Sequence, residues 1–99
     1  MKRFPELENE ASRYLSRHFP DLDVNDPREY SHRSSLVFSV SRRKEEPPRH
    51  QLSLTLELLE WVESPERLRE ILDDQQIAEK MKRAGGKIVW IKRGDLIGE

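Results

Sequence analysis

The side chains able to carry out chemistry are scattered along this chain of 99 residues. The three histidines, His18, His32 and His50, are 14 and 18 residues apart, so no two of them have the spacing of a helical zinc-binding motif. The many serines include no G-x-S-x-G turn, the arrangement that exposes a nucleophilic serine. We therefore expect no metal site and no catalytic residues, and we predict that the chain is not an enzyme.

Two pairs of neighbouring acids, Glu45-Glu46 and Asp73-Asp74, are the remaining candidates for acid–base chemistry. Such chemistry requires one carboxyl group to be buried so that its pKa rises. Both pairs lie among charged residues at expected loop or helix-cap positions, so we interpret them as solvated surface. The chain has no cysteine, which excludes disulfides and thiolate metal sites. We predict no cofactor.

Two basic clusters have the composition of a nucleic-acid contact. One follows the first apolar segment, and the other leads into a tryptophan near the end of the chain. Basic side chains can hold phosphates while an aromatic ring stacks on a base. The alternative is a solvated helix face, with the tryptophan in the core. The candidate contacts for nucleic acid or another partner are Arg42, Arg43, Lys44, Lys80, Arg83, Lys87, Trp90, Lys92 and Arg93.

The clearest pattern consists of two segments in which apolar and polar residues alternate, 36–40 and 51 to about 59. Alternation places the apolar side chains on one face of a strand. We expect these strands to form an antiparallel hairpin whose tip, residues 42–49, contains Pro47-Pro48. A helical interpretation of 51–62 is also open, because Leu54, Leu58, Trp61 and Val62 fit one helix face.

Helix signals flank this hairpin on both sides. Residues 4–19 have apolar residues at helical spacing, and 21–33 is expected to be a loop with a helical turn at 27–30. Ser64-Pro65 predicts the start of a second helix. The apolar residues after Asp74 fall on a different face of this helix from those before Asp73, so we expect a break at Asp73-Asp74. Asp73 is expected to cap a further helix, which ends at Gly85-Gly86. Residues 87–92 predict a third strand.

These elements predict one α+β domain spanning residues 1–99, with the order α-β-β-α(α)-β. The expected architecture is a two-layer sandwich, a mainly antiparallel sheet with helices on one face. A winged helix-turn-helix over residues 65–97 is the alternative for the C-terminal part, with Gln75, Gln76, Lys80 and Arg83 as readers. The residues expected in the core include Leu52, Leu54, Leu56, Ile71, Leu72 and Ile88.

The charge of the chain is balanced overall but unevenly distributed. Charged residues make up 37% of the chain and the formal net charge is −1, while residues 57–74 carry seven acids against two arginines and 79–95 carry six bases against two acids. No apolar segment reaches membrane-spanning length or resembles a signal peptide, so we predict a cytoplasmic protein without a membrane partner.

We predict a small non-catalytic module that binds another protein or itself. The four consecutive apolar residues Ile88–Ile91 are typical of a strand that is covered on both faces, either at the centre of the sheet or in a dimer interface. A free sheet edge is also open for this segment, and two copies would form a homodimer through it. The alternative function is nucleic-acid binding by the basic C-terminal helix and strand.

Overall fold

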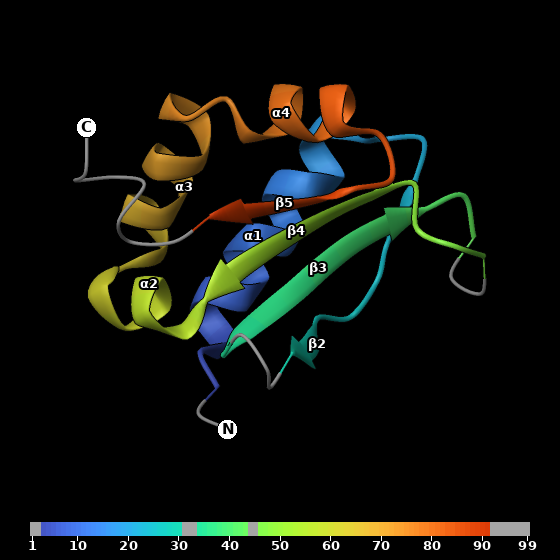
Figure 1. Cartoon of the computed structure of the whole chain (residues 1–99). Helices are drawn as coiled ribbons and strands as arrows, with labels where there is room; N and C mark the ends of the chain where they lie inside the picture. The colour runs from blue at the N-terminus through green and yellow to red at the C-terminus, as the bar shows by residue number, and fades with distance from the viewer. Residues whose placement is uncertain (1–2, 31–33, 44–45, 92–99) are drawn as a thin grey trace.

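A computed structural model describes residues 3–30, 34–43 and 46–91 and confirms the α+β fold (Figure 1). The helices pack on a five-stranded, mostly antiparallel sheet. In chain order the elements are α1 Pro5–His18, β1 Asp23–Val24, β2 Arg28–Tyr30, β3 Ser35–Ser41, β4 His50–Thr55, α2 Leu56–Trp61, α3 Pro65–Asp74, α4 Ile77–Ala84 and β5 Ile88–Ile91.

The predicted hairpin is present as β3 and β4, and it forms the centre of the sheet. Leu36 pairs with Leu54 and Phe38 with Leu52 in antiparallel register. The short strands β1 and β2 both pair with β3 on its other side, while β5 pairs with β4 in parallel. A parallel pair requires a crossover connection, and α2, α3 and α4 supply it.

The core lies between the sheet and the helices. Alternate residues of β3 and β4 face α1, α2 and α4, and α3 packs on α1 and α4. Figure 1 shows the sheet in front of α1, with α4 above it and α2 and α3 at one end. The sheet residues that are completely buried in this core are Leu36, Phe38, Val40, Leu52 and Leu54.

The second strand is shorter than the sequence pattern predicts. We expected it to continue to about Leu59, but β4 ends at Thr55 and α2 begins at Leu56. The Thr55 hydroxyl accepts a hydrogen bond from the Leu58 amide at 3.2 Å, which caps the new helix. Leu58 and Leu59 then enter the core from a helix, and Leu56 is half-buried rather than part of the core.

Two further expectations were wrong in detail. Residues 28–30 form β2 rather than a helical turn, because they pair with β3 in antiparallel register. Ile88 is half-buried, since it pairs with Gln51 on the side of the sheet that faces away from the core. The third strand predicted over 87–92 is present as β5, which joins the main sheet beside β4, so the described residues do not form the wing of the alternative interpretation.

The break between the last two helices occurs later than predicted. α3 continues through Asp74, and the chain turns at Gln76, which has a left-handed backbone with φ of 51°. Gln76 makes no side-chain cap, so the expected D-x-x-Q capping box is absent. Instead, the buried Tyr14 hydroxyl donates to the Leu72 carbonyl at 3.2 Å and accepts from the Ala78 amide at 3.0 Å. One side chain of α1 therefore bridges the end of α3 and the start of α4.

The other end of α4 is held by the first residue of β4. His50 Nδ1 lies 3.1 Å from the carbonyl oxygens of both Met81 and Gly85. Carbonyls only accept hydrogen bonds, so Nδ1 carries the proton that it donates to them. Gly85 has a positive φ of 63°, a conformation that glycine adopts readily after a helix.

Replacing Tyr14 by phenylalanine tests the bridge between α3 and α4. The variant keeps the ring but leaves a buried carbonyl and a buried amide without the hydroxyl. We expect the free energy of unfolding to fall by about 1–3 kcal/mol, measured by urea denaturation. Tyr30, which is 41% exposed, provides the control, and Tyr30→Phe should lower the free energy of unfolding by less than Tyr14→Phe does. Equal losses in the two variants would contradict this role for Tyr14.

The same variant has a pH signature. Burial raises the pKa of the Tyr14 phenol above its ordinary value of 10.0, so the folded state holds this proton more tightly than the unfolded state. The resulting stabilisation is present below pH 10 and is lost as pH rises through the folded-state pKa. Between pH 8 and pH 11, the free energy of unfolding should therefore fall more steeply with pH for the wild type than for Tyr14→Phe. Parallel pH profiles would contradict the expectation.

Candidate functional site

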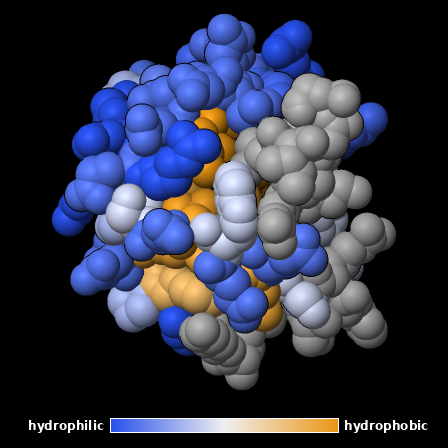
Figure 2. All heavy atoms as spheres, turned by 90° about the vertical axis from the view of Figure 1, so that its left-hand side faces the viewer, coloured by the Kyte–Doolittle hydropathy of each residue, from blue (hydrophilic) through white to orange (hydrophobic). Residues whose placement is uncertain are grey.

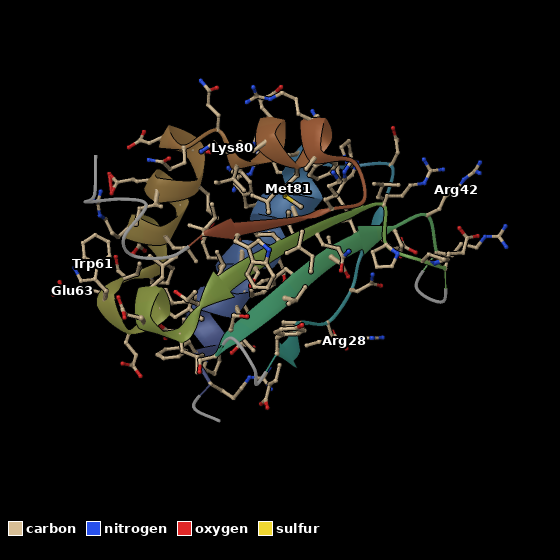
Figure 3. The ribbon with its side chains drawn as sticks, viewed as in Figure 1. Arg28, Arg42, Trp61, Glu63, Lys80 and Met81 are labelled. Carbon is tan, nitrogen blue, oxygen red and sulfur yellow. The ribbon has the colours of Figure 1, made fainter. Side chains whose placement is uncertain are left out.

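The predicted basic contacts lie in two separate places. Lys80 and Arg83 project from α4, and Lys87 follows this helix at the start of the last strand. Arg42 and Arg43 follow β3 at the hairpin tip, and Figure 3 shows Arg42 at the opposite end of the molecule from Trp61, with Lys80 above the sheet. The remaining predicted contacts, Lys44, Lys92 and Arg93, lie outside the described residues.

The structure does not bring Trp90 together with the cations of α4. In the parallel pair Leu54 is opposite Ile91, and both side chains face the helices. Trp90 is opposite Ser53, one position away, so its ring projects from the other face. The sheet therefore separates the ring from α4, and nucleic-acid binding through these residues stays a prediction.

The face of the sheet that carries Trp90, here called the outer face, has an aromatic pair at its centre. The rings of Tyr30 from β2 and Trp90 from β5 meet edge to face, with centroids 6.0 Å apart. Their strands are separated by β3 and β4, which places the two backbones about 14 Å apart. The rings can meet because Ser35 and Ser53, the residues opposite them, have small side chains.

The two serines below this aromatic pair are unusual in their burial. Ser35 and Ser53 are completely buried, and the hydroxyl of each has no hydrogen-bond partner among the described residues. A buried hydroxyl without a partner is destabilising, because it loses its bonds to water. Ser41, on the same face, differs: its hydroxyl donates to the Arg43 carbonyl at 2.6 Å and accepts from Asn25 Nδ2 at 3.2 Å.

The two edges of the sheet differ in their capacity to accept another strand. One edge is divided between β1 and β2, strands of two and three residues, with Pro27 and charged side chains between and within them. Short strands, proline and charge all discourage pairing with a further chain. The opposite edge is β5, whose four residues carry no charge and which pairs, within the described chain, with β4 alone. Trp90 is 37% exposed on this edge.

A polar cleft of about 800 Å³ lies at one end of the outer face. It is bounded by the connection between β1 and β2, by β3 and β4, and by the hairpin tip. Arg28 is its cation, and Asp26 and Glu46 are its carboxylates, so the charges in its lining nearly balance. The sequence pattern did not predict this cleft, because the segments that line it are distant in sequence. They come together because β2 pairs with β3, whereas we had expected residues 28–30 to lie in a loop.

The described residues contain no group of three acidic or histidine side chains positioned to hold a metal ion. In the same residues, no helix combines the length and apolar character needed to cross a membrane.

Removing the buried hydroxyls provides a direct test of the outer-face geometry. Ser53→Ala and Ser35→Ala keep the space below the aromatic rings but remove an unpaired polar atom. We expect each to raise the free energy of unfolding by about 1 kcal/mol. Ser41→Ala is the matched control and should lower it by a similar amount, since its hydroxyl is hydrogen-bonded. Destabilisation by all three substitutions in chemical denaturation would show that the two hydroxyls are paired.

Comparison with known proteins gave no matches. No protein-family model, no curated protein and no solved structure is significantly similar to the chain. The function proposed below therefore rests on the contacts, burial and charges of this chain alone.

Proposed function

We propose that this chain is a small non-catalytic interaction module that pairs with a second copy of itself through the edge strand β5. The observation that carries the proposal is the difference between the two edges of the sheet. One edge is divided between two short strands, whereas the other presents an uninterrupted, uncharged strand with an exposed tryptophan. An edge strand that pairs on one side alone within the described residues favours pairing with another strand.

A second copy fits this edge because the strand is complementary to itself. Two β5 strands related by a two-fold axis run antiparallel, so each apolar side chain lies beside another. Among the described residues, the charge that adjoins the strand is Lys87, at its start, and in the sequence Lys92 follows its last residue. In an antiparallel pair the two Lys87 side chains lie at opposite ends of the interface, roughly 13 Å or more apart, so the repulsion between these two side chains is small.

The outer face would gain from this pairing as well. The sheet would become continuous across two copies, and the two Trp90 rings would lie on the same side of it. Half-buried Ile88 on this face, and half-buried Val89 on the side that faces the helices, would both lose their remaining exposure to water. A domain of 99 residues has a modest core, so additional burial between copies makes a useful contribution to its stability.

Light scattering coupled to size-exclusion chromatography tests this proposal. Across a dilution series, the wild-type mass should approach twice the monomer value at high concentration. Ile88→Lys places a charge on the edge strand and should weaken association by about tenfold or more. Glu29→Lys, a charge change on β2 at the opposite edge, is the matched control and should leave association unchanged.

Three results would contradict the proposal. One is a wild-type monomer at all concentrations up to the millimolar range. Another is a dimer that Ile88→Lys leaves intact. A third is equal weakening by the substitutions at the two edges, which would indicate a general charge effect.

A further inference from the structure

A second surface, on the helical side of the molecule and away from β5, has the properties of a peptide-binding site. A groove of about 610 Å³ lies where the start of α1, the end of α2 and the start of α3 meet. Figure 2 shows the face formed by this end of the molecule, where hydrophobic atoms of the described residues are exposed beside hydrophilic ones. The residues lining the groove are Arg3, Phe4, Pro5, Glu6, Leu7, Leu59, Glu60, Val62, Glu63 and Pro65.

The floor of this groove is apolar and firmly held. Leu7, Leu59 and Val62 contribute to it and belong to the main core, so their positions are fixed by packing on all other sides. Pro5 and Pro65 are the first residues of α1 and α3, where the proline ring restricts the backbone. The groove is therefore largely preformed, which lowers the entropic cost of binding.

The rim of the groove is acidic. The carboxylates of Glu6, Glu60 and Glu63 are exposed, and none of them forms an ion pair among the described residues. In Figure 3, Glu63 projects outward beside Trp61 at this end of the molecule.

The one cation in the lining is already neutralised. The Arg3 guanidinium donates to Glu8 Oε2 at 3.1 Å and to its other oxygen, Oε1, at 2.5 Å, and the Phe4 amide donates to Glu8 Oε2 at 2.8 Å. The hydrogen bond from Arg3 is the main cause that lowers the pKa of Glu8 and keeps this carboxylate ionised. The lining therefore carries three negative charges, around an apolar floor, that no cation of the described residues pairs with.

We infer that this groove binds a short basic peptide segment of a partner protein, in which bulky apolar side chains are flanked by lysine or arginine. The apolar side chains would fill the floor, and the cations would meet Glu6, Glu60 and Glu63. The charge of the rim repels phosphate groups, which excludes nucleic acid and anionic lipid as occupants of this site. The site is independent of the self-association proposed above, because β5 contributes none of its lining.

Fluorescence anisotropy with labelled synthetic peptides tests the inference. The probe is the hexapeptide Lys-Arg-Leu-Leu-Lys-Arg, with two control peptides in which the leucines become alanine or the basic residues become glutamate. Titrations use both the wild type and Ile88→Lys, so that binding at the groove is separated from pairing at β5. We expect the probe to bind both proteins alike, and both control peptides to bind at least about tenfold more weakly. Affinity should fall as salt rises.

A pair of charge-matched double variants locates the binding site. Glu60→Lys with Glu63→Lys reverses the rim and should weaken probe binding by about tenfold or more. Glu66→Lys with Glu70→Lys makes the same change in net charge on the exposed surface of α3, outside the groove, and should have a much smaller effect. Circular dichroism spectra of all four proteins confirm that they are folded.

Absence of probe binding to the folded wild type would overturn the inference. So would equal weakening by the two double variants, or equal binding of the basic and acidic peptides. Probe binding to the wild type that Ile88→Lys abolishes would also overturn it, because it would place the peptide at the β5 edge rather than in the groove.

Discussion

The path of the chain after the hairpin depends on two polar side chains that hold α4 at its ends. The Tyr14 hydroxyl joins the last turn of α3 to the first turn of α4, and His50 binds the carbonyls where α4 ends. Both groups come from elements earlier in the chain. Because they fix where α4 begins and stops, they also fix where β5 starts and allow it to run parallel to β4.

The two faces of the sheet have different roles as a consequence of strict alternation in β3 and β4. Leucine, phenylalanine and valine on one face build the core, while serine dominates the other. Small side chains leave room for Tyr30 and Trp90 to meet above them, although the rings come from the two sides of the sheet. Below these rings lie the hydroxyls of Ser35 and Ser53, which are buried and have no hydrogen-bond partner among the described residues. The apolar area that the rings cover acts against the destabilising effect of these hydroxyls.

Much of the fold was predictable, because it is encoded locally. The alternation of 36–40, the spacing in 4–19 and the Ser64-Pro65 cap gave β3, α1 and α3 with small errors in their limits. The errors arose where the structure depends on contacts distant in sequence. The leucine alternation predicted a strand over all of 51–59, yet the Thr55 cap starts a helix at Leu56. The break after α3 lies where the Tyr14 hydroxyl bonds both helices, and not at a cap formed by Asp73.

The surfaces were harder to predict than the fold. The α4 cations and Trp90 are close in sequence and were therefore predicted to form one contact surface. The register of β5 instead places the Trp90 ring on the face of the sheet opposite α4. The acidic groove joins residues 3–7 to residues 59–65, a combination that no local pattern indicates.

Amide hydrogen exchange at two protein concentrations tests the pairing of β5 most directly, because it identifies the strand involved. If two copies pair through this edge, exchange of the Ile88–Ile91 amides that point away from β4 should slow as concentration rises. Amides in β2, at the opposite edge, should exchange at the same rate at both concentrations. Exchange in β5 that is independent of concentration, in a sample that light scattering shows to be dimeric, would contradict the account and place the interface elsewhere.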